Sequence, residues 1–297
     1  MADANARAAC VVVTYDALPW IEQCLASVAG SQTIVVDNGS SDGTPDAVRA
    51  SFPAVRVIES ENRGLSAGWN TGIEATHAEH VILLNADAWL VEDALARLVD
   101  AADRHPRAAA VGPRLLNTDT TLQRSVRGYP TLWRLATEYL YLRKLAPRSR
   151  ALNAFYGAGF DHESEREVEW VMGACLLVRR AAYDEVGPFD ERYFMFSEEV
   201  DWMRRAGDRG WSVVFTPEAL CVHVGGASHG GRLFRENVSG QLRYLSLHGR
   251  PGEAERARRL LRASLLVRGR LHGGDRGRLY REVAAWLGSG DAESLIA

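Results

Sequence analysis

The chain has 297 residues, 46% of them hydrophobic and 25% charged, and a formal net charge of -3. This composition is typical of a globular protein and excludes a fibre, a disordered tail and a disulfide-bonded miniprotein. The longest apolar run, residues 8–13, is far shorter than the roughly 20 residues of a membrane-spanning helix, and no signal-peptide pattern opens the chain. We therefore expect a cytoplasmic protein with one large domain or two ordinary ones.

Four cysteines lie far apart in the sequence, never form a CxxC pair and sit in apolar surroundings. Such thiols are typical of a reducing cytoplasm, where they stay free and buried. The four are Cys10, Cys24, Cys175 and Cys221.

Charge is distributed unevenly along the chain. Residues 232–297 hold 13 arginines against 7 acidic residues, whereas residues 1–231 have a net charge of -9. A second basic stretch, residues 125–150, mixes arginines with tyrosines and a tryptophan. Two basic zones therefore flank an acidic body.

The first hundred residues alternate between strand and helix patterns. Short runs of apolar and β-branched residues predict buried strands over residues 10–14, 33–37, 55–58 and 81–84. Helical patterns follow these strands, beginning at Pro19 and Thr44 and covering residues 66–75 and 91–102. This alternation predicts an α/β fold built on a doubly wound, mainly parallel, Rossmann-like sheet.

The second half has a different pattern. Residues 171–179 and 212–216 predict further strands, and residues 219–228 run from a strand into a glycine turn. A helix is predicted to begin at Glu198. From residue 232 onward the pattern is mainly helical and arginine-rich, with breaks at residues 249–252 and 273–274.

Polar residues follow the predicted strands of the first half. Ligands bind at the carboxyl ends of the strands in a parallel sheet, so these residues are the first candidates for a site, and we expect them to meet at one crevice. They are Thr14, Tyr15, Asp37, Asn38, Glu61, Asn62, Arg63, Gly64, Asn85, Ala86 and Asp87.

Asn85 and Asp87 end a predicted strand, where residues two apart project to the same side. A divalent cation prefers oxygen ligands and often binds through one or two carboxylates together with substrate phosphates. The tripeptide therefore indicates a variant D-x-D metal site. A polar strand end that caps the next helix is the alternative.

Two other positions also have simpler explanations. Asp37 either organises the following NGSSDG turn or accepts a hydrogen bond from a nucleobase or ribose. Gly64 and Gly68 are spaced by four, unlike the G-x-G-x-x-G of a dinucleotide fold, which disfavours a nicotinamide dehydrogenase. They either pack a helix closely on the sheet or, with Arg63, place a helix N-terminus at a diphosphate.

Acids and histidines supply the remaining candidates. Glu198, Glu199 and Asp201 lie in the first turn of a predicted helix, where one or two acids serve the helix dipole and a third is a candidate general base. His223 and His229 lie among glycines that let a backbone approach phosphate. Core or surface histidines are the usual case, and this setting strengthens the alternative of a metal or phosphate site.

Six segments, taken together in their order and spacing, resemble the family 2 inverting glycosyltransferases of GT-A fold. Among these, the resemblance is strongest to bacterial rhamnosyltransferases and related enzymes of cell-wall and polysaccharide assembly. The segments are VVVTYD, IVVDNGSSDGT, ENRGLSAGWNTGI, LLNADAWL, GACLLVRRAAYDEVGPFDERYFMFSEEVDW and VHVGGAS. They cover residues 8–231, and the basic tail is less diagnostic.

The resemblance implies a nucleotide-sugar donor, an acceptor hydroxyl and a divalent metal, Mg²⁺ or Mn²⁺, that bridges the donor's diphosphate. It implies that the nucleoside and donor crevice are formed by Thr14, Tyr15, Asp37, Asn38, Arg63, Gly64, Asn70, Asn85 and Ala86. It places the metal at Asp87, with His223 as a second ligand. It also implies a nucleotide-sugar-binding part (residues 1–110), an acceptor-binding and catalytic part (111–231) and a basic helical extension (232–297).

Two departures from the family pattern concern the chemistry. Asn85 stands where the family often has an acid, which lowers the charge of the metal site. The catalytic E-D pair is Glu198-Glu199 here, so the base is Glu199, with Glu198 and Asp201 as alternatives. Glu199 would take the proton of the acceptor hydroxyl, and a single displacement would invert the anomeric centre.

The basic aromatic zones fit a glycan or polyprenyl-diphosphate-linked acceptor and peripheral contact with the anionic inner face of the cell membrane. Solvated arginine-rich helices are the alternative. We expect no nucleic-acid partner, and the sequence leaves the oligomeric state open.

Three other functions stay open. A sugar-phosphate nucleotidyltransferase would have a glycine- and arginine-rich phosphate loop where this chain has TYDALPW. A non-enzymatic binding protein would not need Asp87, Glu199 and Asp201. A glycosyltransferase that acts on a small natural-product acceptor also fits the motifs.

Overall fold

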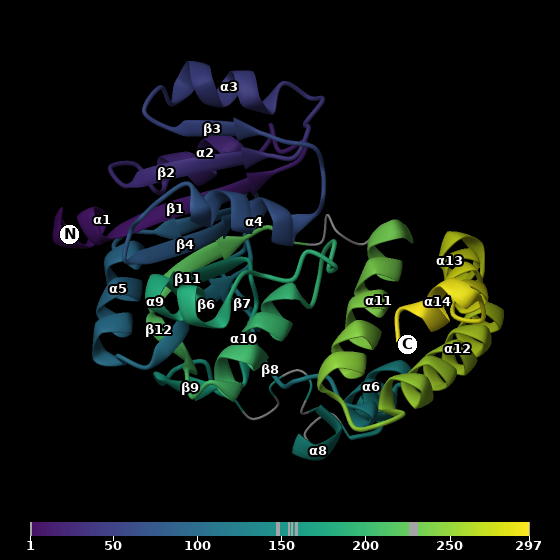
Figure 1. Cartoon of the computed structure of the whole chain (residues 1–297). Helices are drawn as coiled ribbons and strands as arrows, with labels where there is room; N and C mark the ends of the chain where they lie inside the picture. The colour runs from purple at the N-terminus through teal and green to yellow at the C-terminus, as the bar shows by residue number, and fades with distance from the viewer. Residues whose placement is uncertain are drawn as a thin grey trace. The chain divides into compact units, whose positions relative to one another are not determined.

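The computed structural model describes residues 2–146, 149–153, 155, 157, 160–225 and 231–296. The chain forms two compact units (Figure 1). The first unit comprises residues 1–127, 161–194 and 198–227, and the second comprises residues 128–160, 195–197 and 228–297. Among the described residues, no helix has the length and hydropathy needed to cross a bilayer.

The N-terminal half of the first unit is the alternating fold predicted from the sequence. Its four parallel strands are β1 (Ala8–Thr14), β2 (Gln32–Asp37), β3 (Arg56–Glu59) and β4 (His80–Asn85). The helices between them are α2 (Ile21–Ala26), α3 (Thr44–Ser51) and α4 (Leu65–Glu74). A short helix that the sequence did not predict, α1 (Ala2–Arg7), precedes β1.

The C-terminal half of the sheet is mixed. The order is β3-β2-β1-β4-β11-β6-β12-β5, which Figure 1 shows running from β3 to β12. Strand β11 (Cys175–Arg179) is antiparallel to both β4 and β6, β12 is parallel to β6, and β5 is antiparallel to β12. The other bounds are Ala108–Leu116 for β6, Ser212–His223 for β12 and Ala88–Val91 for β5. The fold is of the predicted α/β class, with the parallel pairs concentrated in β1 to β4.

Four short strands complete the pattern. Strand β7 (Leu122–Gln123) pairs with β6, and β9 (Arg166–Val168) pairs with β12. Strands β8 (Val126–Arg127) and β10 (Trp170–Val171) form a separate antiparallel pair. None of these strands was predicted as a separate element.

Several boundaries differ from the sequence prediction. The helix predicted over residues 91–102 is α5 (Ala94–Arg104), because residues 88–91 form the edge strand β5. The strand predicted over residues 171–179 is interrupted by a turn at Gly173. The two strands predicted on either side of Pro217 are one strand, β12, with an irregularity in its pairing between Thr216 and Leu220.

The core lies on both faces of this sheet. Residues alternate along β1, so Cys10 and Val12 join the cluster formed with α2 and α5. Val11 and Val13 face α4 instead, where a Cβ on Gly68 would approach Val13 Cγ1 to 2.7 Å. The packing explanation of Gly68 is therefore confirmed. The four cysteines are free and buried, as predicted.

The first unit also contains two helices that follow strand β11. They are α9 (Arg180–Val186) and α10 (Glu198–Asp208). Helix α10 packs against β10, β12 and α9, and its first turn holds the predicted acids.

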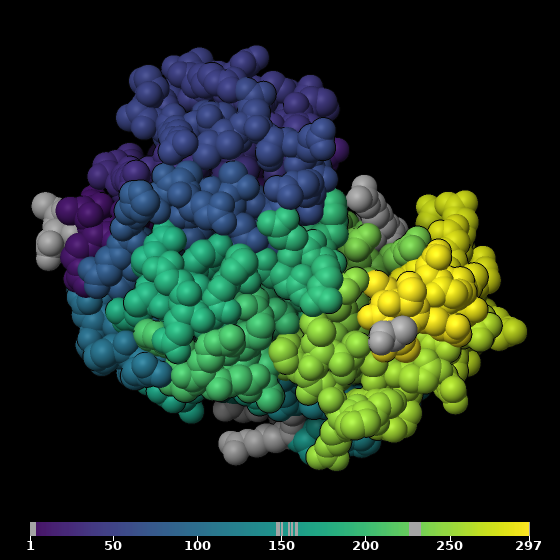
Figure 2. Space-filling view, viewed as in Figure 1, coloured from purple at the N-terminus to yellow at the C-terminus, as the bar shows by residue number. Residues whose placement is uncertain are grey.

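The second unit is helical. Its longer helices are α6 (Leu132–Tyr139), α11 (Gly231–His248), α12 (Glu253–Leu271) and α13 (Gly274–Trp286), with shorter α7 (Leu142–Leu145), α8 (Arg150–Asn153) and α14 (Gly290–Ser294). The predicted breaks at residues 249–252 and 273–274 separate α11, α12 and α13. In the space-filling view, α12 to α14 form a continuous surface (Figure 2).

The three functional parts predicted from the sequence remain a prediction, because compactness does not show which part binds which substrate. In the structure the first two predicted parts share the sheet of the first unit.

Candidate active site

The ends of β1 and β2 are joined by a buried hydrogen-bond network around Asp37. Thr14 Oγ1 donates to Asp37 Oδ1 at 2.8 Å, and the backbone amides of Gly39 and Ser40 donate to Oδ2 at 3.1 and 2.9 Å. Asp37 is 1% exposed. The prediction that Asp37 organises the turn is therefore confirmed, and its contact with a nucleoside stays a prediction.

Asn38 links this turn to the loop before α4. Its backbone amide donates to the Thr14 carbonyl at 2.9 Å, and its side-chain Nδ2 donates to the Gly64 carbonyl at 3.1 Å. Tyr15, by contrast, is 59% exposed at the end of β1. The predicted nucleoside residues thus divide into a buried frame and one exposed aromatic ring that a ligand can reach.

Gly64 is required where the loop before α10 crosses the loop before α4. Its φ is +99°, and a Cβ placed there would lie 2.3 Å from the Phe194 carbonyl oxygen. The adjacent Leu65 amide donates to the same oxygen at 2.7 Å. A side chain at position 64 would therefore separate the two loops. Arg63 pairs with Glu191 at 3.0 Å on the exposed side of this crossing.

Asn70 holds the loop that follows α9. Its Nδ2 donates to the Phe189 carbonyl at 2.9 Å and to Glu191 Oε1 at 3.2 Å, while its Oδ1 accepts from the Phe189 amide and the Tyr183 hydroxyl. The side-chain amide is therefore occupied by protein groups. The structure gives Asn70 a positioning role, and a direct contact with the donor remains a prediction.

The edge strand β5 brings the two predicted metal ligands together. Ala88 pairs with His223 of β12, and the Val224 amide donates to the Asp87 carbonyl at 3.0 Å. His223 Nε2 lies 3.5 Å from Asp87 Oδ1. Burial raises the pKa of Asp87, but His223 and nearby backbone amides outweigh burial, so the pKa lies below its ordinary value and the carboxylate is ionised at neutral pH.

The other two residues of the tripeptide lie at the same strand end. The Asn85 amide donates to the Ala174 carbonyl at 3.0 Å, and its carbonyl faces the Cys24 thiol at 3.5 Å. Ala86 is buried. The other histidine predicted for this region, His229, lies outside the described residues.

Gln123 is a site residue that the sequence did not reveal. Its Oε1 lies 2.7 Å from His223 Nδ1, and its Nε2 donates to Asn117 Oδ1 at 3.0 Å and to the His223 carbonyl at 3.2 Å. Because the Gln123 Nε2 group is the donor in both of these hydrogen bonds, Gln123 Oε1 is the acceptor for a proton on His223 Nδ1. His223 Nε2 is then the ring atom that remains for a metal ion.

A second group of possible metal ligands belongs to the structure of the sheet edge. Glu79, His80 and Asp103 lie close together, but Arg7 donates to Glu79 at 2.8 Å and to Asp103 at 2.7 Å. The guanidinium bridges the two carboxylates, so the cluster joins α1 to the rest of the unit.

The predicted catalytic acids have different environments in the first turn of α10. Glu198 is 2% exposed, whereas Glu199 is half-buried and its Oε1 accepts from the Gly173 amide at 3.4 Å. Each acid has a buried Oε2 without a hydrogen-bond partner in the described part of the chain. Burial raises the pKa of both groups, and in Glu198 the adjacent Glu199 charge adds to this effect.

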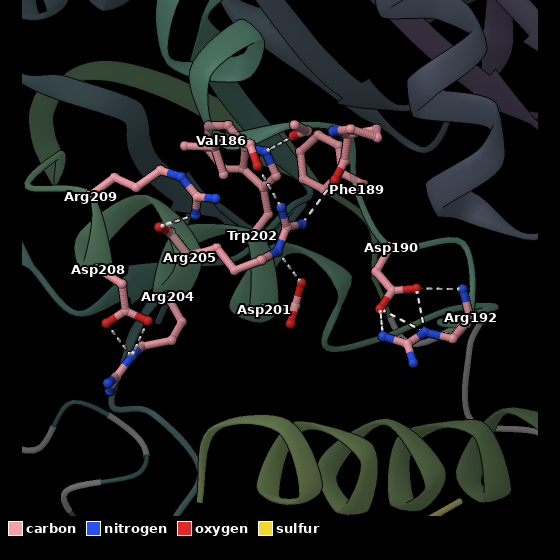
Figure 3. A network of polar contacts seen from close by, with 12 residues as sticks. Val186, Phe189, Asp190, Arg192, Asp201, Trp202, Arg204, Arg205, Asp208 and Arg209 are labelled. Carbon is pink, nitrogen blue, oxygen red and sulfur yellow. Dashed lines mark hydrogen bonds and ion pairs between the residues drawn. The ribbon is translucent and has the colours of Figure 1, made fainter.

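Asp201, the third acid, is paired (Figure 3). Its Oδ2 accepts from Arg205 Nε at 2.8 Å, and Arg205 also donates to the carbonyls of Val186 and Pro188 at 3.2 and 2.9 Å. The Trp202 ring nitrogen donates to the Gly187 carbonyl in the same loop at 2.9 Å. These contacts attach the loop after α9 to α10, and they leave Glu199 as the more accessible candidate base.

Residues 9–187 match the family model described as "Glycosyl transferase family 2". Over 233 residues the chain is 36% identical to the N-acetylglucosaminyl-diphospho-decaprenol L-rhamnosyltransferase of Mycobacterium tuberculosis, covering 72% of this chain and 74% of that protein. It is 25% identical over 224 residues to the glycosyltransferase AglE of Haloferax volcanii, covering 72% of this chain and 65% of AglE.

The chain belongs to glycosyl transferase family 2. The fold agrees, since the family 2 chain superposes on the mannosyltransferase PcManGT of Pyrobaculum calidifontis, solved with GDP-Man and Mn²⁺, with a TM-score of 0.56 at 19% identity. That match covers 98% of this chain and 83% of the other. GalNAc-T7, solved with UDP, GalNAc and Mn²⁺, gives a TM-score of 0.58 at 13% identity, covering 98% and 57%. The predicted GT-A fold and glycosyltransferase class are confirmed.

The raised pKa of Glu198 predicts a stability effect in this family 2 protein. A buried acid whose folded-state pKa is raised favours the protonated form, so its stabilising contribution is lost as pH rises through that pKa. Glu198→Gln should therefore stabilise the protein at pH 8 by about 1–2 kcal/mol and have little effect at pH 4.5. Thermal unfolding at the two pH values measures this difference. Equal destabilisation at both pH values would contradict it.

Proposed function

We propose that this chain is an inverting glycosyltransferase that moves a sugar from a nucleotide-diphosphate sugar, dTDP-rhamnose-like or a UDP-sugar, to a hydroxyl of a lipid-linked or polysaccharide glycan. The observation that supports it most is the 36% identity to a mycobacterial enzyme named as a diphospho-decaprenol rhamnosyltransferase. The acceptor of that relative is a sugar on a polyprenyl diphosphate, and we propose the same class here.

The donor is proposed to bind at the ends of β1, β2 and β4. The buried Thr14–Asp37–Asn38 frame fixes the backbone there, and Tyr15 offers an exposed ring for the nucleobase. Arg63, already paired with Glu191, would turn to the diphosphate of the donor.

A divalent ion, Mg²⁺ or Mn²⁺, fits the donor set at the end of β4. Asp87 supplies an ionised carboxylate, and His223 supplies an imidazole whose Nε2 lies on the same side as that carboxylate. Carboxylate ligands suit Mg²⁺ and Mn²⁺, and an added imidazole favours a transition metal. A bound ion would stabilise negative charge on the leaving diphosphate.

Glu199 is proposed to act as the general base. A base must be able to reach the acceptor hydroxyl, and Glu199 is the only one of the three acids in the first turn of α10 that is neither fully buried nor ion-paired in the described structure. Its Oε1 accepts from the Gly173 amide, and its Oε2 is buried without a hydrogen-bond partner among the described residues, so a rotation of the side chain would turn this oxygen toward the acceptor hydroxyl. A raised pKa brings the base closer to neutral pH, where proton transfer is most effective.

Gln123 is expected to hold His223 in the orientation that binds the metal. Gln123→Leu removes the acceptor for Nδ1, so we expect Mn²⁺ affinity to fall about 10–100-fold. Gln123→Glu keeps an acceptor oxygen and should restore much of that affinity. Titration of Mn²⁺ in the presence of a nucleoside diphosphate, followed by electron paramagnetic resonance, measures both variants. Mn²⁺ affinity equal to wild type in Gln123→Leu would show that Gln123 has no such role.

The cellular setting is part of the proposal. A polyprenyl-linked acceptor is held in a bilayer, so we propose that the enzyme works in the cytoplasm at the inner face of the cell membrane, in peripheral contact with it. The arginine-rich second unit supports this setting.

A donor screen tests the proposed function against its alternatives. Purified protein is incubated with dTDP-, UDP- and GDP-sugars and Mn²⁺, and thermal shift identifies the donor, because a bound ligand stabilises the folded state. Release of nucleoside diphosphate that chelator abolishes supports a metal-dependent glycosyltransferase. Pyrophosphate exchange would support a nucleotidyltransferase, and binding without turnover would support a non-enzymatic protein. Transfer only to small natural products would favour the other acceptor class.

A further inference from the structure

Two segments of the second unit expose several aliphatic side chains, four of them by 46% or more. Leu145 is 80% exposed, Leu271 is 76%, Val267 is 54% and Leu140 is 46%. Isolated exposed aliphatic side chains are ordinary on a protein surface, but several in two adjoining segments indicate an apolar patch. We refer to these four residues as the leucine patch.

Contacts around Arg268 join the two segments. The Arg268 guanidinium lies 3.8 Å from the centre of the Tyr141 ring and donates to the Glu138 carbonyl at 3.0 Å. One turn earlier in α12, Ser264 donates to the Tyr139 carbonyl at 2.5 Å. Leu140 and Leu145 are close in sequence to Tyr141, and Val267 and Leu271 are close to Arg268. The leucine patch therefore lies at one end of the helical unit, where α6, α7 and α12 end.

The two segments that carry this patch are rich in basic residues. Residues 138–145 and 266–278 contain six basic residues and two acidic ones. Both acids are paired, Glu138 with Arg143 at 2.6 Å and Asp275 with Arg278 at 2.5 Å. Lys144, Arg270 and Arg276 are exposed, and Lys144 lies over the Tyr141 ring at 4.4 Å. The surroundings of the leucine patch are thus basic.

We infer that the leucine patch and its basic rim bind the surface of an anionic lipid bilayer. Projecting leucines can insert at the boundary between headgroups and acyl chains, while lysine and arginine reach lipid phosphates. The rim carries an excess of one sign, which fits an anionic surface and would repel a second copy of the same patch. The inference rests on the proposed function only in expecting an acceptor at a membrane, because the patch and its charges are independent of that chemistry.

The inference is tested by flotation of the full chain with vesicles. Vesicles contain phosphatidylethanolamine with either phosphatidylglycerol or, as the neutral comparison, phosphatidylcholine. Wild type should float with the anionic vesicles at low salt and much less at high salt or with the neutral ones. Leu145→Ser with Leu271→Ser should reduce the vesicle-bound fraction at least roughly tenfold, and Lys144→Glu with Arg270→Glu should do the same.

Leu247→Ser is the matched control, because Leu247 is 44% exposed on α11, outside the leucine patch. It should bind vesicles like wild type. Binding of the Leu145/Leu271 variant at the wild-type level, or no flotation of wild type at all, would overturn the inference. The inference would also be overturned if light scattering showed that the wild type is a dimer, that the leucine substitutions dissociate it, and that neither form binds vesicles.

The vesicles contain no acceptor, so the outcome is separate from that of the proposed function. Donor turnover measured in detergent should be unchanged in both patch variants. Vesicle binding without any glycosyl transfer would support the membrane-binding surface and refute the proposed reaction. Transfer without vesicle binding would support the reaction and refute the surface.

Discussion

Glu199→Gln should lower kcat for sugar transfer by roughly 10² to 10⁴-fold while leaving the dissociation constant of the donor nearly unchanged. Glutamine has a similar shape and can still accept from the Gly173 amide, but it cannot take a proton from the acceptor hydroxyl. Steady-state kinetics with saturating donor and acceptor, together with isothermal titration of the donor, separate the two effects.

Two control variants separate the loss of the base from a general effect on the protein. Glu185→Gln changes an exposed acid of α9 and should leave kcat at the wild-type level. Asp201→Asn breaks the pair with Arg205 and should lower stability more than it lowers kcat. An active Glu199→Gln enzyme would contradict the assignment and move the role of base to Glu198 or Asp201.

The pH profile follows from the same residue. A base must be deprotonated to act, so activity falls as pH falls through its pKa. Burial raises the pKa of Glu199, and the acid limb of kcat/KM should therefore lie above the pH at which an ordinary glutamate ionises, about 4.3. In Glu199→Gln that limb should disappear from the residual activity.

Asp87→Asn should abolish most metal-dependent transfer, by roughly 10²-fold or more, because it removes the ionised ligand of the proposed site. Binding of the nucleoside diphosphate in the presence of Mn²⁺ should weaken, whereas binding without metal should stay as in wild type. Chelator should reduce wild-type activity to the level of the variant and have little further effect on the variant itself.

An acid added at position 85 offers a comparison with the loss of the acid at position 87. Asn85→Asp restores an acid at the position where the family often has one, and it should tighten Mn²⁺ binding without loss of stability at the strand end. Full metal-dependent activity in Asp87→Asn would contradict the site, since no other described carboxylate lies beside His223 Nε2 within salt-bridge distance.

Local patterns were enough to predict the nucleotide-binding half of the fold. The runs at residues 10–14 and 33–37 are β-branched and buried on both faces, so strand type and the parallel arrangement follow from the residues alone. The turn role of Asp37 was open to prediction for the same reason, because Asx turns are set by neighbours in sequence.

The remaining strands and the metal-binding part of the site depend on pairing between segments that are distant in sequence. The predicted helix begins at residue 91, but residues 88–91 form strand β5 because β12 pairs with them. That pairing brings Asp87 to His223 across more than a hundred residues of sequence. Gln123 has no motif of its own, since its role arises only from the short strand β7 beside β6.

The candidate catalytic acids also show what the sequence can predict and what needs the structure. The sequence singled out Glu198, Glu199 and Asp201 but could not rank them, because rank depends on burial and partners. The structure separates a fully buried acid, a half-buried acid and an ion-paired acid. Their environments, rather than their order in the chain, favour Glu199.

The central claim is that this family 2 chain transfers a sugar from a nucleotide-diphosphate donor with inversion at C1. The most direct measurement uses dTDP-rhamnose, Mn²⁺ and an N-acetylglucosaminyl polyprenyl diphosphate acceptor, with mass spectrometry and nuclear magnetic resonance of the product. We expect an acceptor heavier by one deoxyhexose, with an anomeric configuration opposite to that of the donor. Retention of configuration, or failure of every nucleotide sugar to give transfer, would contradict it.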